Sequence, residues 1–172
     1  MRSEAIHLHL DMIQDKLDEQ LELVCAMTGD VDALVTLQER LVNLVKQLNV
    51  PLIEVSMVIQ DMIVPMVDSL IEHAKETNAS LPDSIIEKWP IDEIIHVDVE
   101  SSLAIEKILS VLDQDRMDII TTLIRVTMVE TEMILIDAVS SLRMWEHQAR
   151  TQLSRITSPG QLFSPFELPE DW

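Results

Sequence analysis

The residues best placed to do chemistry in this sequence are Glu93, His96 and Glu100. They are spaced at i, i+3 and i+7, so a helix would carry all three on one face. The Glu-x-x-His spacing is the one that di-metal carboxylate bundles use, because it directs a carboxylate and an imidazole at one ion. Such a site needs a second pair, and the residue three positions before His147 is Met144. A solvated polar stripe is the commoner interpretation of this pattern.

A second group of carboxylates, Glu130 and Asp137, lies one heptad apart among apolar residues. Two carboxylates in an apolar setting can act as acid and base or hold a divalent ion. The all-α nucleotide pyrophosphatases cluster carboxylates in this way, but their EExxE and ExxD pairs are absent here. A salt bridge between helices, or a contact with a partner, is the commoner explanation. The candidate metal ligands are therefore Glu93, His96, Glu130 and Asp137, and we expect no tightly bound metal and no cofactor.

Three polar residues, Asp98, Ser101 and Ser102, interrupt the apolar face of the segment that carries Glu93. Buried polar groups must be hydrogen-bonded or they cost free energy. The three residues either line a polar pocket in the bundle, or the serines bond to their own backbone where the face reaches solvent. Both alternatives remain open, and the second is the commoner.

No pattern supports nucleophilic catalysis or phosphate binding. No serine lies in a strand–turn–helix elbow, and the two glycines, Gly29 and Gly160, cannot form a glycine-rich phosphate loop. Cys25 has no basic neighbour, which predicts an inert core thiol. We assign no catalytic residue, and the sequence favours a protein that is not an enzyme.

The elements that position these residues are predicted to be helices. Hydrophobic residues make up 47% of the 172-residue chain, which contains only two glycines and seven prolines. Long segments without either residue favour an all-α fold over a β fold. We predict a single bundle of about five helices, with a short helical piece after a capping box at 80–83 and a bend near Ser140 in the last helix. The predicted helices cover 4–27, 30–48, 51–77, 91–112 and 115–155.

The predicted helix 51–77 is aliphatic around most of its circumference, and its charges, including Glu54, fall in one narrow stripe. Such a helix is either central in the bundle or buried against a second chain. Because methionine adapts to irregular surfaces, Met57, Met62 and Met66 are candidate partner contacts. Surplus apolar surface of this kind predicts a homodimer or an obligate complex.

The chain divides into a predicted helical bundle, 1–157, and an extended acidic-aromatic tail, 158–172. The tail reads SPGQLFSPFELPEDW and contains both phenylalanines and one of the three tryptophans. Its apolar side chains either cover a groove of their own bundle or dock on a partner as anchors. The candidate partner-binding residues of the tail are Phe163, Phe166, Leu168 and Trp172.

The net charge of −19, from 31 acidic and 12 basic residues, restricts the partners. Such a field repels nucleic acids and anionic membranes and attracts basic proteins. A single cysteine and the absence of a signal-peptide or membrane-span pattern predict a cytoplasmic protein. We therefore predict a non-enzymatic acidic helical interaction protein, that is, an adaptor, assembly factor or inhibitor.

Two alternatives to this function remain. One is a nucleic-acid mimic of phage or plasmid type that blocks a DNA- or RNA-binding protein. The carboxylates of Asp11, Asp15, Asp18 and Glu22 follow one another along one helix face, where they could be spaced like phosphates. The other is a helical-bundle enzyme with a carboxylate metal site at the candidate ligands named above.

Overall fold

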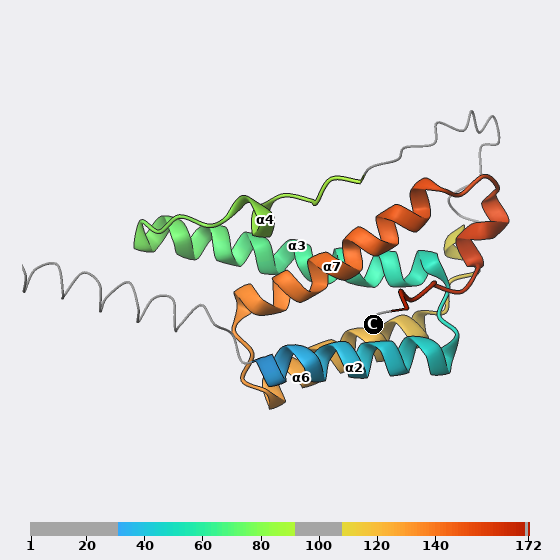
Figure 1. Ribbon diagram of the computed structural model, residues 1–172, viewed down its shortest axis with the longest axis horizontal. Helices are drawn as coiled ribbons and strands as arrows, with labels where there is room; N and C mark the ends of the chain where they lie inside the picture. The colour runs from blue at the N-terminus through green and yellow to red at the C-terminus, as the bar shows by residue number, and fades with distance from the viewer. Residues whose placement is uncertain (1–30, 92–107, 171) are drawn as a thin grey trace, which may run out of the picture. The chain divides into compact units, whose positions relative to one another are not determined.

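The computed structural model describes residues 31–91, 108–170 and 172, and the chain is mostly helical (Figure 1). Among these residues, the one strand-like pairing is an isolated bridge between Pro51 and Pro165. The predicted all-α fold class is therefore confirmed. The described helices are α2 (Val31–Leu48), α3 (Leu52–Thr77), α4 (Asp83–Ile86), α6 (Gln114–Glu130) and α7 (Leu135–Ser154), with a 3₁₀ helix, η1 (Pro159–Phe163).

Helix α3 is the centre of the compact unit formed by residues 32–172, because it contacts α7, α6, α4 and η1 (Figure 1). It starts after Pro51 and ends at Asn78, whose positive φ of 53° stops the helix. The next residue closes the last turn, since the Ala79 N–H donates to the Ala74 carbonyl at 2.9 Å. The aliphatic circumference of α3 is thus covered by several neighbours of the same chain, which is the first of the two predicted alternatives.

The core lies where α2, α3, α6 and α7 meet. On α2, Leu37 and Leu41 are fully buried at helical spacing, as expected for an amphipathic helix. Full burial of such a side chain contributes about 1.5–3 kcal/mol to stability. The Trp145 side chain is also fully buried, and its indole N–H donates to Gln38 Oε1 at 2.8 Å, which connects α7 to α2.

The predicted last helix, 115–155, is two helices, and the predicted bend near Ser140 is wrong. Helix α6 ends at Glu130, and Glu132 has a left-handed φ of 51°. The Met133 N–H then donates to the Met128 carbonyl at 2.9 Å, and the Glu132 N–H donates to the Val129 carbonyl at 3.3 Å. This pair of hydrogen bonds is a Schellman motif. Because a glutamate occupies the left-handed position where glycine is usual, the sequence carried no signal for this helix end.

The two-helix arrangement buries Arg143, a charged residue of α7 that is only 3% exposed. Its guanidinium donates to the carbonyls of Ile85 and Ile86 at 2.8–3.1 Å and pairs with Glu146 at 2.5 Å. Lys88 Nζ lies 3.7 Å from the second oxygen of Glu146. These contacts hold α4 against α7. No side chain caps α4, which starts directly after Pro82, so the predicted capping box is wrong.

A second buried ion pair positions α6 on α3. Glu54 is only 1% exposed, although the sequence pattern placed it in a charged stripe. Its carboxylate accepts hydrogen bonds from the Arg116 guanidinium, at 2.5 and 2.7 Å, and from the Asp113 N–H at 3.0 Å. The hydrogen bond to Glu54 raises the pKa of Arg116 above its ordinary value. Because a buried carboxylate needs such partners, this contact fixes where α6 begins relative to α3.

Candidate interaction surfaces

The C-terminal tail folds back onto its own bundle. The Phe166 ring is buried and stacks on Trp145 with centroids 5.6 Å apart, and the Trp172 ring lies 4.6 Å from Trp145. The Phe166 N–H donates to the Val50 carbonyl at 2.8 Å, and the Leu52 N–H donates to the Ser164 carbonyl at 2.9 Å. Two backbone hydrogen bonds and an aromatic stack therefore attach the tail beside the start of α3.

A side chain of α7 also holds the tail. Gln152 donates through Nε2 to the Glu167 carbonyl at 2.6 Å and accepts from the Glu167 N–H at 3.0 Å. Leu168 packs against the core, whereas Phe163, in η1, is only half-buried. The tail thus covers a groove of its own bundle. Among its candidate partner-binding residues, Phe163 has the least contact with the core.

The candidate methionines of α3 face their own chain. Met62 is buried in the core, and Met57 and Met66 are half-buried against it. Val64 is the one large aliphatic side chain of α3 that is highly exposed among the described residues, at 46%. The apolar surface available to a partner therefore lies on other helices.

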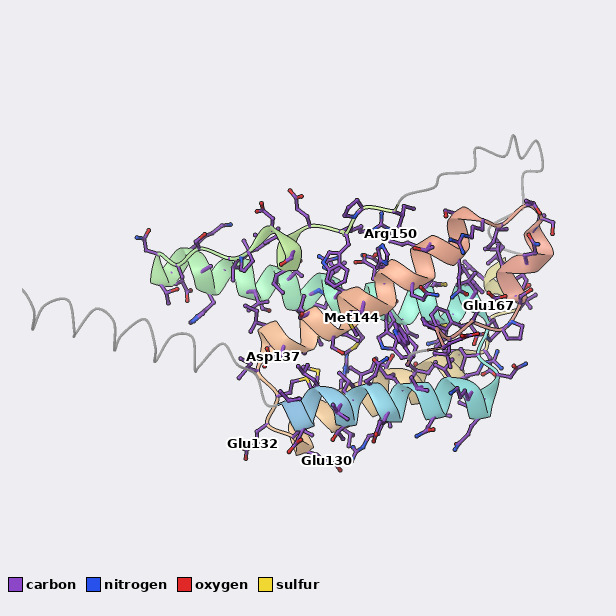
Figure 2. The ribbon with its side chains drawn as sticks, viewed as in Figure 1. Glu130, Glu132, Asp137, Met144, Arg150 and Glu167 are labelled. Carbon is purple, nitrogen blue, oxygen red and sulfur yellow. The ribbon has the colours of Figure 1, made fainter. Side chains whose placement is uncertain are left out.

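The carboxylates Glu130 and Asp137 belong to different helices. Figure 2 shows Glu130 at the end of α6 and Asp137 at the start of α7. Glu130 pairs with Arg40 of α2 at 2.6 Å, and Arg40 also donates to the Thr127 hydroxyl at 3.1 Å. Burial raises the pKa of Asp137 above its ordinary value of 3.8. Glu130 is thus occupied by a salt bridge between helices, which is one of the two explanations predicted for it.

The other chemical candidates, Cys25, Glu93, His96, Asp98, Ser101 and Ser102, lie outside the described residues, as do the mimic carboxylates between Asp11 and Glu22. Within 31–91, 108–170 and 172, no group of three or more His, Cys, Asp or Glu side chains is placed to hold a metal ion.

One apolar surface is the outward side of α6, which we call the α6 outer face: Ile119, Thr122, Leu123, Val126 and Val129. Ile119 is 49% exposed, Val126 45% and Val129 79%. A shallow groove of about 440 Å³ runs along the first four of these residues. The opposite side of α6 supplies Ile120 and Ile124 to the core. Sequence reasoning missed this face because the sequence does not show which side of the helix packs against the core.

Acidic side chains stand at both ends of the α6 outer face. Asp115 and Asp118 are exposed in its first turns, and Glu130 and Glu132 are exposed at its last. Arg125 is exposed along one edge and makes no hydrogen bond or ion pair with the part of the chain that the structure describes. The face is therefore an apolar strip between two acidic ends.

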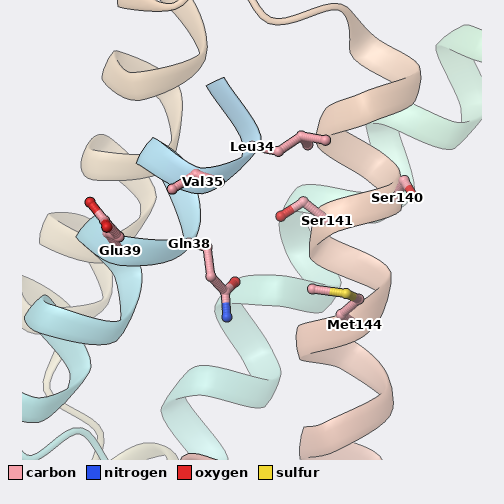
Figure 3. Close-up of a pocket in the computed structure, with 7 residues that line it drawn as sticks. All are labelled: Leu34, Val35, Gln38, Glu39, Ser140, Ser141 and Met144. Carbon is pink, nitrogen blue, oxygen red and sulfur yellow. The ribbon is translucent and has the colours of Figure 1, made fainter. Parts of the chain in front are cut away.

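A second candidate surface is a groove of about 310 Å³ between α2 and α7 (Figure 3). Leu34 extends from α2 toward α7, the Ser141 hydroxyl points back toward α2, and the Glu39 carboxylate turns away from the groove. The walls are mainly apolar, since Val35 and Met144 are both more than one-third exposed beside it. The α2–α7 groove is lined by Leu34, Val35, Gln38, Glu39, Ser140, Ser141 and Met144.

None of the helices in the described ranges is long and apolar enough to cross a bilayer. No protein-family model matches the chain, and no curated protein or solved structure is significantly similar to it.

Proposed function

We propose that this chain is a non-enzymatic, acidic, helical interaction protein of the cytoplasm whose α6 outer face binds an amphipathic helix of a basic protein. The observation that carries the proposal is the exposed strip formed by Ile119, Val126 and Val129. Apolar positions seven and three residues apart on a helix are typical of helix–helix docking. An adaptor, assembly factor or inhibitor would use such a face.

The dimensions and the charge of the face define the partner. Ile119 and Val129 are ten residues apart, which corresponds to about 15 Å of helix, or nearly three turns. A partner helix would present apolar side chains at i, i+4 and i+7 to this strip. Lys or Arg near both ends of the partner helix would lie beside Asp118 and Glu132, and such charges raise the association rate and the specificity.

A heteromeric complex fits this charge better than a homodimer does. Two copies of the chain would bring net charges of −19 together, and that repulsion opposes association at low salt. Sedimentation at low and high salt measures this directly. Self-association that strengthens with salt would favour the predicted homodimer, and a monomer at both salts would favour a separate basic partner.

The test of the face uses a designed helical peptide with a leucine seam and lysines at both ends, labelled for fluorescence anisotropy. Val126→Lys places a charge in the strip and should weaken binding tenfold or more. Val64→Lys is the matched control, because Val64 is also a helical valine, is 46% exposed and lies on α3. It should change the affinity less than twofold.

Two further results decide between specific docking and general attraction of opposite charges. A peptide with glutamates in place of the lysines should bind much more weakly, and added salt should weaken the lysine peptide without abolishing its binding. Equal losses in Val126→Lys and Val64→Lys would contradict the proposal, because they would show that net charge rather than the α6 outer face binds the peptide.

A further inference from the structure

The α2–α7 groove contains polar groups that have no hydrogen-bond partner among the described residues. Ser141 is only 6% exposed, and its hydroxyl has no hydrogen-bond partner among the described residues. The hydroxyl oxygen is not among the buried atoms without a partner in the described residues, so it is the part of Ser141 that is accessible from the groove. The Ser141 hydroxyl points across the groove toward α2 (Figure 3). It is therefore a hydrogen-bonding group that is available to a molecule in the groove.

Gln38 supplies the second polar group, and Trp145 holds it in place. The indole N–H of Trp145 can only donate, so the Gln38 atom that it contacts at 2.8 Å must be the carboxamide oxygen. The two N–H bonds of the Gln38 amide have no partner in the part of the chain that the structure describes. Because Trp145 is fully buried, it anchors this amide on a rigid part of the core.

We propose that the α2–α7 groove binds a neutral, mainly apolar small molecule that carries a carbonyl oxygen. The side chains of Leu34 and Met144 would cover its apolar body, and Gln38 N–H and the Ser141 hydroxyl would donate to its oxygen. A groove of about 310 Å³ is at the lower end of the range for ligand pockets. A net charge of −19 disfavours an anion. The groove and the α6 outer face share no residue, so this inference is independent of the proposed function.

The test uses prodan, a neutral naphthyl ketone whose emission shifts to the blue in apolar surroundings, with the full-length chain. Prodan should bind saturably at one site. Ser141→Ala removes one donor with little change of volume and should weaken binding about five- to tenfold. Gln38→Glu keeps an oxygen for Trp145 but replaces the N–H donors with a carboxylate, so it should weaken binding more than tenfold. Ser69→Ala, at an exposed serine of α3, is the matched control and should bind as the wild type does.

An analogue of prodan without its propionyl group tests the hydrogen bonds separately. It should bind more weakly than prodan to the wild type, and Ser141→Ala should not weaken it further. The inference is overturned if prodan does not saturate, if Ser141→Ala and Gln38→Glu bind it like the wild type, or if Val126→Ser on the α6 outer face weakens it as much as they do. The last result would place the dye on α6.

Discussion

Replacing Phe166 with alanine should destabilise the protein strongly, although the residue lies in a proline-rich tail. Its ring is 6% exposed and stacks on Trp145, so truncation leaves a cavity against the core. A change from Phe to Ala at a buried site costs about 3–5 kcal/mol. We expect about 3 kcal/mol, because the tail backbone keeps its hydrogen bonds to Val50 and Leu52 and can partly collapse into the space.

For a unit of this size, 32–172, such a loss lowers the thermal midpoint by roughly 10 °C. Guanidinium denaturation followed by circular dichroism gives the free energy of unfolding. Phe163→Ala is the matched control, because it is the same residue type three positions earlier and is only half-buried. It should cost less than about 1 kcal/mol. If Phe166→Ala costs no more than Phe163→Ala, the tail does not cover the core in solution and this reasoning is refuted.

Three further predictions concern single contacts. Arg116→Met leaves the buried Glu54 carboxylate without its counter-charge and should cost about 3–5 kcal/mol in denaturant unfolding; a cost below about 1 kcal/mol would contradict the role given to the pair. Glu132→Gly relieves a left-handed φ of 51° and should stabilise by about 0.5–1 kcal/mol, whereas Glu132→Ala, which removes only the charge, should not. Burial raises the pKa of Asp137 above 3.8, so its ionised form opposes folding. Asp137→Asn should therefore raise the thermal midpoint at neutral pH, and this advantage should disappear as the pH falls through the raised pKa to below 3.8; an advantage that persists there would show a different cause.

Much of the helical arrangement could be predicted because it depends on local signals. Pro51 marks the start of α3, and Asn78, which tolerates a left-handed conformation, lies at its end. The leucines of α2 repeat at helical spacing, and Leu37 and Leu41 are buried as that spacing predicts. These features depend on residues within a turn or two of one another, so the sequence is enough to read them.

The errors of prediction have two sources, a helix end that lacks its usual glycine and contacts between residues far apart in the chain. At the end of α6, Glu132 has the left-handed conformation that glycine usually takes. The Met133 N–H closes this helix end by donating to the Met128 carbonyl, and no glycine in the sequence marks the position. Arg143 reads as a surface charge until carbonyls from α4, nearly sixty residues earlier in the chain, accept its hydrogen bonds.

The sequence by itself determined the all-α class, the acidity and most of the helix ends that the structure describes, because these follow from composition and from contacts within a few residues. Only the tertiary structure decided which surfaces remain for a partner. From the sequence, the apolar side chains of α3 and of the aromatic tail were both candidates for binding a partner. In the structure, Met62 of α3 is buried in the core, and Phe166 of the tail stacks on Trp145. The exposed strip of α6 and the position of Ser141 in the α2–α7 groove could not be predicted beforehand, since burial depends on which helices pack together.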